Sequence, residues 1–540
     1  MTIDKVKIVN YKCYKNETIS LKSQRTIFVG DNDVGKSTIL EAISLVLTRK
    51  LNGKQIDYQL RTSLFNNDFR KDYLNQIAIP GSTVSPPEIV IEAYMTDGPP
   101  EYRGNNNSSH EDFIGVQLRI FFNPDYDKEY NCLKEKSLIK DIPIEYYKVE
   151  WRDFSGAFIS NRGMKISSFL IDASRKNTSG VVEDFVLRSI DEYLTPDEKN
   201  NISSDYRQFK QSFANNVNLA RLSDIINQNE IIPDHQIGFT SSEINPDDWK
   251  KDIFVNIDNL PFENLGFGTQ NIIKVELALR NQNKGADIVL IDEPENNLSY
   301  VAMHKLMDYI NRTKADAQII ITTHSSFIAN RLSLNNVSLI GKRIVSFTSL
   351  EKESCQFFEK LPNYDTLRFA LSQTSVLVEG PTDSLIFERA YMDYKGKWPI
   401  DDGVAVISVG ALSFKHYCNI AKMTKNKVII ITDNDGDIEK NIYKKYEDYY
   451  GKFDNIKFFF DENEKNNTLE PSVLEANSVE GIPNKSFLEI VCEKPGSIRN
   501  IEGLNSFMQN NKVLWAMRVY EAKTEISYPD HIVAAIHECN

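Results

Sequence analysis

Two short stretches of this chain carry residues whose types and spacing are suited to chemistry. Residues 29–38 read VGDNDVGKST, in which two glycines precede a lysine and two hydroxyl residues. Residues 428–437 read VIIITDNDGD, an apolar run that ends in closely spaced acids. The first pattern is typical of a loop that binds phosphate, and the second is typical of a site for a divalent cation.

The phosphate-binding pattern has the flanking elements that it requires. Residues 25–30, RTIFVG, predict a short buried strand, and residues 37–47, STILEAISLVL, predict a helix with one apolar face. Glycines in such a loop let backbone N–H groups point at phosphate oxygens, the lysine adds a cation, and the Ser37 hydroxyl is offered to Mg²⁺. The residues expected to bind nucleotide here are Gly30, Asn32, Gly35, Lys36, Ser37 and Thr38.

Two later strands end in residues that would complete an ATP site. Residues 287–294, DIVLIDEP, predict an apolar strand that ends in Asp292, suited to the shell of Mg²⁺, and Glu293, suited to polarising the attacking water. Residues 317–324, AQIIITTH, predict another strand, which ends in His324, where it would contact a γ-phosphate. Taken singly, Asp292 also fits a helix cap and His324 a buried core histidine. The helical stretch between the strands indicates a parallel βαβ unit beside the first strand.

The C-terminal third alternates strand-like and helix-like runs. The strand-like runs are SVLVEG (375–380), GVAVISVG (403–410) and KVIIITDNDGD (427–437). This βαβαβ order predicts a parallel sheet, with Glu379, Asp433 and Asp435 at one edge. Acids gathered there repel each other unless a cation lies among them, and oxygen ligands suit Mg²⁺ or Mn²⁺. A solvated acidic loop is the alternative for the two aspartates alone.

Three of these segments resemble the motifs of ABC-type ATPases. GDNDVGKST, LIDEPENNLS and ITTH are similar to Walker A, Walker B with the D-loop, and the switch histidine, in the branch of structural-maintenance-of-chromosomes and recombination-repair proteins. The resemblance implies that nucleotide binds between two heads and that a signature segment, LSGGQ, of one head caps the γ-phosphate held by the other. The candidate signature here is LGFGTQ at 265–270, which departs from that pattern. Gly268 and Gln270 are its residues expected to reach the nucleotide.

The acids of the C-terminal third resemble those of the Toprim fold. An ABC-type head followed by Toprim in one chain resembles the OLD (overcoming lysogenization defect) family of ATP-dependent endonucleases, which includes the nuclease subunit of Gabija phage-defence systems. The resemblance implies ATP and Mg²⁺ or Mn²⁺ as cofactors. It also implies DNA as the substrate, a homodimer or higher homo-oligomer, and a partner protein of a defence system.

The family's site residues are carried over onto the matching positions of this sequence. Glu379, Asp433 and Asp435 match metal ligands, and Asp383 stands where the family usually has a second glutamate. Glu470, in NNTLEPSVLE, resembles a later acidic residue that completes a second metal site. The C-terminal segment KVLWAMRVYEAKTEISYPDHIVAAI resembles the one that carries an active-site lysine, which points to Lys512, with Lys523 as the other option.

The fold class expected is α/β, an ABC-type ATPase head with a helical insert followed by a Toprim-type parallel α/β domain. The expected boundaries are 1–175 and 239–365 for the two pieces of the head, 176–238 for the insert, and 366–540 for Toprim. The insert carries an apolar stripe at helical spacing, which fits an internal core and a dimer face equally. The residues of that stripe are Val182, Phe185, Val186, Ile190 and Leu194.

Composition limits the classes of function. The 540 residues are 41% hydrophobic and 26% charged, which is the balance of a globular protein. The formal net charge of −13 repels nucleic acid at long range, so binding to DNA would depend on local basic surface and on metal ions. Six cysteines without CxxC pairs, no apolar signal segment and no run of about 18 apolar residues favour a protein of the cytoplasm.

The function expected is that of an ATP-regulated, divalent-metal-dependent DNA endonuclease, in phage defence or DNA processing. Glu379, Asp433, Asp435 and Lys512 would act at the nuclease site and Glu293 at the ATPase site. The alternative is a DNA-repair ATPase or clamp whose Toprim domain binds nucleic acid without cutting it.

Overall fold

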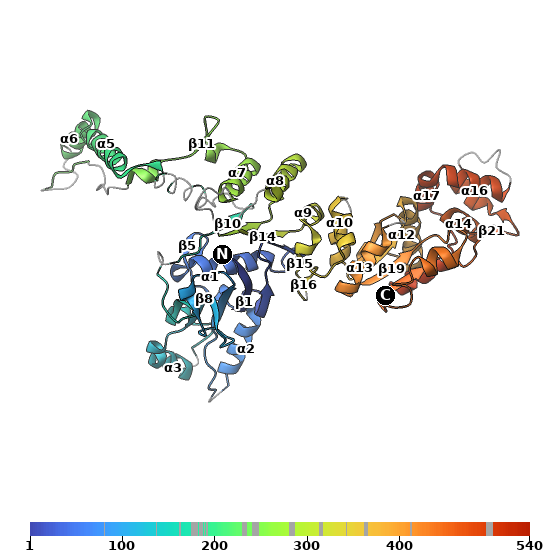
Figure 1. Cartoon of the computed structure of the whole chain (residues 1–540), viewed down its shortest axis with the longest axis horizontal. Coiled ribbons are helices and arrows are strands. Elements are labelled where there is room, and N and C mark those ends of the chain that lie inside the picture. The colour runs from blue at the N-terminus through green and yellow to red at the C-terminus, as the bar shows by residue number, and fades with distance from the viewer. Residues whose placement is uncertain are drawn as a thin grey trace.

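The computed structural model contains an N-terminal part, residues 1–360, and a C-terminal part, residues 365–539, which follow one another along the long axis of the molecule (Figure 1). The residues that the structure describes are 1–79, 82–136, 138–160, 164–173, 182, 187, 190, 193–228, 235–239, 248–279, 287–312, 317–341, 343–360, 365–410, 413–492 and 500–539. Among the helices of these ranges, none is both long and apolar enough to cross a bilayer.

Two six-stranded sheets form most of the N-terminal part, and the described residues also include two short two-stranded sheets. The first is antiparallel, with the order β2-β1-β6-β8, and both β7 and β9 pair with β8. The second has the order β10-β13-β14-β3-β15-β16 and is parallel except for β16. The strands of the first sheet are β1 (Ile3–Tyr11), β2 (Tyr14–Ser20), β6 (Ile89–Met95), β7 (Arg103–Gly104), β8 (Phe113–Phe122) and β9 (Tyr147–Asp153). Those of the second are β3 (Arg25–Val29), β10 (Ser168–Asp172), β13 (Ile288–Asp292), β14 (Gln318–Thr323), β15 (Val337–Leu339) and β16 (Val345–Ser346).

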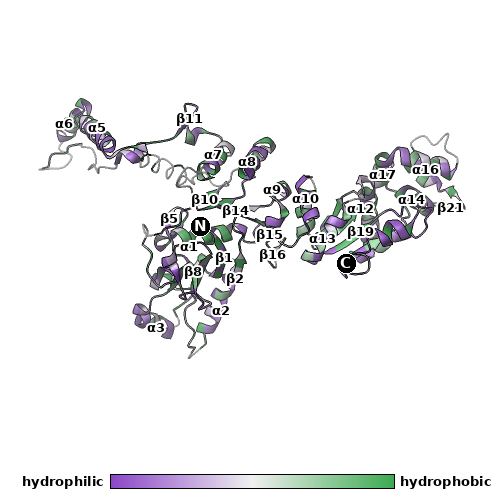
Figure 2. Ribbon diagram, viewed as in Figure 1, coloured by the Kyte–Doolittle hydropathy of each residue, from purple (hydrophilic) through white to green (hydrophobic). Residues whose placement is uncertain are grey.

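Helix α1 (Lys36–Thr48) packs between these two sheets. Phe28 and Ile320 of the parallel sheet belong to the core around α1, whereas Ile27 and Ile321 belong to the core on the opposite face. Strands β3 and β14 are therefore apolar on both faces, as expected for a parallel sheet covered on both sides. Figure 2 shows hydrophobic residues along α1. The predicted βαβ unit is confirmed, with β14 lying between β13 and the phosphate-loop strand β3.

The structure describes further helices in the N-terminal part. They are α2 (Asn67–Ile77), α3 (Asp127–Glu135), α5 (Pro196–Ala214), α6 (Val217–Gln228), α7 (Phe267–Leu279), α8 (Tyr300–Arg312), α9 (Ser326–Arg331) and α10 (Lys352–Lys360). Helices α5 and α6 lie at the end of the molecule farthest from the C-terminal part (Figure 1). Neither helix has a buried side chain, and Phe209 and Phe213 of α5 are 67% and 59% exposed.

The apolar stripe expected in the helical insert is partly described. Ile190 packs with Trp249 in a small core, and Leu194 lies against that core. This part of the stripe is therefore an internal core. Phe185 and Val186 lie outside the described residues, as does the expected boundary at residue 175.

Four parallel strands form the sheet of the C-terminal part, in the order β18-β17-β19-β20. The strands are β17 (Thr374–Val378), β18 (Val404–Ser408), β19 (Lys427–Ile431) and β20 (Ile456–Phe459), and a hairpin of β21 (Ser478–Val479) and β22 (Ile482–Pro483) lies outside the sheet. The helices are α11 (Thr366–Leu371), α12 (Pro381–Lys395), α13 (Phe414–Thr424), α14 (Leu469–Ala476), α15 (Lys485–Val491), α16 (Ile501–Asn510), α17 (Lys512–Glu521) and α18 (Asp530–Glu538). The predicted βαβαβ order is confirmed, and β20 is an additional strand beyond it.

One continuous apolar core joins the two parts. It contains Ile27 and Ile321 of the parallel sheet in the N-terminal part and Leu377 and Ile430 of the sheet in the C-terminal part. The opposite face of the C-terminal sheet has its own core, formed with α12 and α14 to α18. The strands alternate between the two, since Val376 and Val378 lie in the second core while Leu377 lies in the first.

Helices α9 and α10 of the N-terminal part meet α11 and α13 of the C-terminal part along this core, and we call this contact the seam. The ring of Tyr417 on α13 makes edge contacts with Phe358 on α10, at 5.2 Å, and with Phe369 on α11, at 4.9 Å. A buried polar contact accompanies the rings, because Asn419 donates to the Ser354 hydroxyl at 3.0 Å. The seam is therefore packed and specific, which favours a fixed arrangement of the two parts.

We predict that truncation at the seam uncouples the unfolding of the two parts. Phe358 is fully buried, and a Phe358→Ala substitution leaves a cavity that costs on the order of 3–5 kcal/mol. Calorimetry should show one cooperative transition for the wild type and two separated transitions for Phe358→Ala. The control is Phe209→Ala, since that ring is 67% exposed. Two separate transitions in the wild type, unchanged by Phe358→Ala, would contradict the shared core.

Candidate functional site

The phosphate loop connects β3 to α1 with a geometry that requires glycine at one position. Gly35 has a φ of +99°, a left-handed conformation that residues with a side chain rarely adopt. A Cβ atom at Gly35 would also lie 2.5 Å from Cys13 Sγ. The Lys36 side chain is 4% exposed, and its ammonium donates to the carbonyls of Gly30 and Asp31 at 2.9 Å each. The lysine thus points back over its own loop, where the phosphates would lie.

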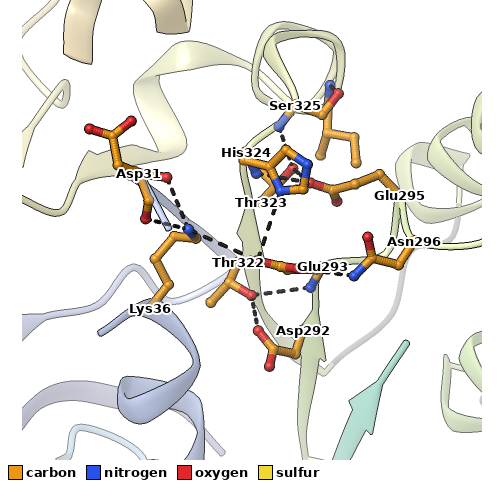
Figure 3. Close-up of polar contacts among 12 residues, drawn as sticks. Asp31, Lys36, Asp292, Glu293, Glu295, Asn296, Thr322, Thr323, His324 and Ser325 are labelled. Atoms are coloured by element: carbon orange, nitrogen blue, oxygen red, sulfur yellow. Dashed lines mark hydrogen bonds and ion pairs between the residues drawn. The ribbon is translucent and has the colours of Figure 1, made fainter. Parts of the chain in front are cut away.

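The predicted acids of the ATP site lie beside this loop, as Figure 3 shows for Asp292 and Glu293. The Ser37 hydroxyl donates to Asp292 Oδ1 at 2.9 Å, and the Thr322 hydroxyl donates to the same oxygen. Burial raises the pKa of Asp292; the hydrogen bonds from Thr322 and Ser37 oppose this rise, while Asp172 and Glu293 add to it. Glu293 Oε1 lies 4.0 Å from Lys36 Nζ. Ser37 and Asp292 are thus placed together, as a shared Mg²⁺ shell requires.

His324 lies between two carboxylates at the end of β14 (Figure 3). Its Nδ1 is 3.8 Å from Glu293 Oε1 and 3.2 Å from Glu295 Oε1. Glu295 is fixed in turn, because its Oε1 accepts from the Thr323 hydroxyl at 2.6 Å and from the His324 backbone N–H at 2.8 Å. The structure therefore brings His324 and Glu293 together. Glu295 was missed from the sequence, although it stands two positions after Glu293 in the same motif.

The other residues predicted to bind nucleotide lie in the loop, at the start of α1 and in the segment at 265–270. Asn32 is exposed in the loop, and Thr38 interacts with the Cys13 thiol. The Gln270 amide is buried and donates to the carbonyls of Glu263 and Leu265, at 3.2 and 2.9 Å. It is thus bonded within its own segment. Gly268 packs closely, since a Cβ there would lie 2.5 Å from the Asn297 carbonyl oxygen. A role for Gly268 and Gln270 toward the nucleotide of a second head stays a prediction.

The predicted acids of the C-terminal part lie at the ends of two neighbouring strands. Glu379 follows β17, and Asp433 and Asp435 follow β19, which pairs with β17. Glu379 Oε1 accepts from the Thr432 hydroxyl at 2.7 Å and from the Asp433 backbone N–H at 3.0 Å. The carboxylate of the first strand is therefore directed at the acidic segment of the second. Thr432 was not identified from the sequence, because only the pairing of the strands shows that it orients Glu379.

The surrounding acids form a cluster of like charge. Burial is the largest cause that raises the pKa of Asp433, and together with repulsion by nearby acids it brings that pKa to about 9; the acids are Glu379, Asp383, Glu470 and Asp435. Burial likewise raises the pKa of Asp383 to about 7, with Glu379 as the next cause. The other four predicted acids therefore lie close enough to Asp433 to raise its pKa.

The acids of this cluster lie near one another, but they are not arranged around a common point where an ion could bind. Within the described ranges, no three acidic, histidine or cysteine side chains are positioned to hold one ion together. Two of the acids have other contacts: Glu379 accepts from Thr432, and Asp383 Oδ2 accepts from the Gly380 N–H at 3.0 Å at the start of α12. The donor set is all oxygen, and several ionised acids side by side favour the entry of a divalent cation, so these residues fit Mg²⁺ or Mn²⁺. Ligation by a common ion would require the side chains to approach one another.

The two lysine candidates differ in their surroundings. Lys512 Nζ, at the start of α17, lies 3.5 Å from Glu470 Oε1. Glu470 is 2% exposed, and its other oxygen accepts from the Thr468 hydroxyl at 2.9 Å. Lys523 is exposed beyond the end of α17. The structure thus brings Lys512, rather than Lys523, to one of the predicted metal ligands.

Two family models match segments of this chain that contain residues of the two sites. Residues 25–330, more than half of the chain, match the family described as "AAA domain, putative AbiEii toxin, Type IV TA system". Residues 371–435 match the family described as "Overcoming lysogenization defect protein-like, TOPRIM domain". The protein is thus an ATPase domain joined to a Toprim domain. The chain belongs to the first of these families and, with its OLD-like Toprim domain, has the architecture of the OLD family.

Solved structures similar to this chain are heads of Smc proteins. The Smc head bound to the C-winged helix domain of ScpA is 15% identical, with 65% of this chain and 100% of that chain covered and a TM-score of 0.31. The Pyrococcus furiosus Smc head with an extended coiled coil is 14% identical, with coverage of 67% and 99% and a TM-score of 0.35. The Thermotoga maritima SMC head is 10% identical, with coverage of 64% and 96% and a TM-score of 0.27. None of the curated proteins matches.

We predict that two substitutions separate nucleotide binding from turnover. Lys36→Ala should weaken binding of a fluorescent ATP analogue by at least about tenfold, because it removes a charge-assisted contact to phosphate. Glu293→Gln should retain binding but lower the rate of ATP hydrolysis by about tenfold or more, since the group that polarises water is lost. Exposed Lys54→Ala is the control for Lys36. Equal binding by wild type and Lys36→Ala would exclude this loop as the nucleotide site.

We also predict that Thr432 affects metal affinity through Glu379. Thr432→Val keeps the shape of the side chain but removes the hydroxyl that donates to Glu379. The affinity for Mn²⁺, measured by electron paramagnetic resonance, should fall by about tenfold to a hundredfold, as for other residues that orient a ligand. Exposed Thr524→Val is the matched control and should leave the affinity unchanged. An unchanged affinity in Thr432→Val would argue against Glu379 as a ligand.

Proposed function

We propose that this protein is an ATP-regulated, divalent-metal-dependent endonuclease that hydrolyses phosphodiester bonds of DNA. The observation that supports this most is the approach of Glu379 to the Asp433 backbone at the ends of paired strands, within a cluster of five acids. The matches to an AAA ATPase domain and to an OLD-like Toprim domain support the same combination of activities.

The residues of the C-terminal part have distinct roles in this proposal. Glu379, Asp433 and Asp435 would hold one or two ions of Mg²⁺ or Mn²⁺, and Asp383 and Glu470 would assist. Such ions, when bound, supply a water of lowered pKa and stabilise charge on the phosphate oxygens. Lys512 would place its ammonium near the scissile phosphate and offset the charge that develops in the transition state. Its 3.5 Å contact with Glu470 would keep it at the cluster.

ATP binding would control the nuclease site through the seam. His324 directly follows β14, and α9 begins two residues later, at Ser326. The Ser326 hydroxyl accepts from the Leu367 N–H of α11 at 3.4 Å, and α11 leads into β17, which ends beside Glu379. A change at the γ-phosphate would thus have a packed route to the metal ligands.

The OLD-like architecture supports a proposal for the cellular setting of the protein. We place the protein in the cytoplasm, as a homodimer or higher homo-oligomer in which the segment at 265–270 reaches the nucleotide of a second subunit. A role in phage defence or DNA processing, with a partner protein of a defence system, fits that architecture.

A second function is a DNA-repair ATPase or clamp that binds nucleic acid without cutting it. The observation that favours this alternative is that no three acids of the described ranges are in position to share an ion. If the acids cannot close around a cation, the Toprim domain would bind DNA but leave it intact.

Nicking of supercoiled plasmid distinguishes these two functions. We expect the wild type to cut in the presence of Mg²⁺ or Mn²⁺ and Glu379→Ala to lose cutting by at least about a hundredfold, because a ligand of the catalytic ion is removed. Lys36→Ala should still cut but respond differently to ATP concentration. Glu489→Ala, whose side chain is 60% exposed, is the control. Plasmid binding without any cutting would support the clamp.

A further inference from the structure

A cavity of about 730 Å³ opens beside the acidic cluster of the C-terminal part. Its size is within the range of about 300–1,000 Å³ that is usual for ligand sites. One wall comes from the end of β20 and the segment after it, including Phe460 and Asp461. The opposite wall comes from the start of α18, including His531. This cavity was not anticipated from the sequence.

The cavity and the acidic cluster share structural elements. Helix α14 carries Glu470 at the cluster, while Ser472 and Glu475 of the same helix line the cavity. Asn434, between the two predicted aspartate ligands, is fully buried and donates to the Asp461 carbonyl at 2.8 Å. A ligand bound in the cavity would therefore lie next to a metal ion or substrate bound at the acidic cluster.

Aromatic rings form much of the cavity wall. Tyr450, Phe458 and Phe460 line it, and Tyr450 lies 5.8 Å from Phe458 and 6.4 Å from Phe460, centroid to centroid. Tyr443, which is 41% exposed, extends this set, with its ring 5.0 Å from that of Tyr450. Aromatic side chains grouped in this way are typical platforms for nucleobases, because every base has a face that stacks.

The charges of the lining favour a base over a phosphate. Four acids and no lysine or arginine are among its residues, so a phosphate would be repelled. Burial lowers the pKa of His531 to about 4, which leaves the imidazole neutral at physiological pH. Asp461 already accepts from Ser472 and Asn466, so it does not require a cation. Glu475 Oε2 also accepts from Asn466, so its Oε1 and the neutral His531 are the groups of this lining offered to the N–H groups on the edge of a base.

Basic residues lie where the backbone of the same strand would pass. A helical turn, Glu439–Lys444, begins four residues after Asp435 and carries the exposed residues Lys440 and Lys444. Lys512 adds a third cation at the cluster. Phosphates would then lie along these lysines and the metal site, with the base turned into the cavity.

We infer that this cavity receives an unpaired nucleobase of the DNA strand held at the metal site. The inference rests on the proposed nuclease function and specifies its substrate as DNA that is single-stranded or easily opened beside the cut. Pairing energy must be lost before a base can turn out of a duplex, so mismatched or bubbled DNA should be favoured.

Photo-crosslinking tests the location directly. The probe is a duplex with a central bubble that contains 5-iododeoxyuridine, irradiated with the full-length wild type and mapped by mass spectrometry. We expect crosslinks to Tyr443, Tyr450 or the segment 458–460. Crosslinks that map only outside the cavity would overturn the inference.

Cutting rates give an independent test. The wild type should cut bubbled DNA about tenfold faster than the matched perfect duplex, and Tyr450→Leu should remove that preference, since stacking on the ring is lost. Tyr450→Phe keeps the ring and should keep the preference, and Tyr58→Leu, at a site 86% exposed in the N-terminal part, should change neither rate. Thermal melting of both Tyr450 variants checks that they fold.

The outcomes separate this inference from the proposed function. Equal cutting of bubble and duplex by the wild type would overturn the nucleobase site and leave the nuclease intact. Absence of cutting of either DNA would reject the nuclease function, and the inference with it.

Discussion

The apolar core that continues from one parallel sheet into the other is the constraint on which both candidate sites depend. Because Ile321 of the N-terminal sheet and Leu377 of the C-terminal sheet belong to the same buried cluster, the two sheets are joined as packed layers rather than linked by a free chain. Each sheet presents its functional residues where strands end, as parallel α/β sheets do. The ATP site and the metal site are thus held in one framework, and the seam of α9, α10, α11 and α13 is the path between them.

Repulsion among carboxylates determines the chemistry of the C-terminal site. Burial and the neighbouring acids raise the pKa of Asp433 to about 9. Ionising several buried carboxylates side by side costs free energy, because their negative charges repel one another. Hydrogen bonds from the Thr432 hydroxyl and the Asp433 backbone N–H hold the Glu379 carboxylate close to these other acids. A protein gains little stability from such a cluster, so its presence at the ends of paired strands supports the proposal that a cation binds there.

Much of this organisation was predictable because it is local. The phosphate loop between β3 and α1, the strands ending in Asp292 and His324, and the βαβαβ order follow from short patterns that specify strands, turns and helices. The strand β20 was missed although its residues, IKFF, favour a strand and are bounded by Asn and Asp residues. The orienting role of Thr432, the inward amide of Gln270 and the shared core depend on contacts between residues far apart in the chain, which periodicity does not encode.

Diffraction from crystals grown with Mn²⁺, with anomalous scattering used to locate the ion, tests the central claim most directly. The account predicts an anomalous peak between Glu379, Asp433 and Asp435, with the carboxylates drawn closer than in the cluster described above. A structure in which Mn²⁺ is absent from this edge and Glu379 stays bonded only to Thr432 and the Asp433 backbone would contradict it.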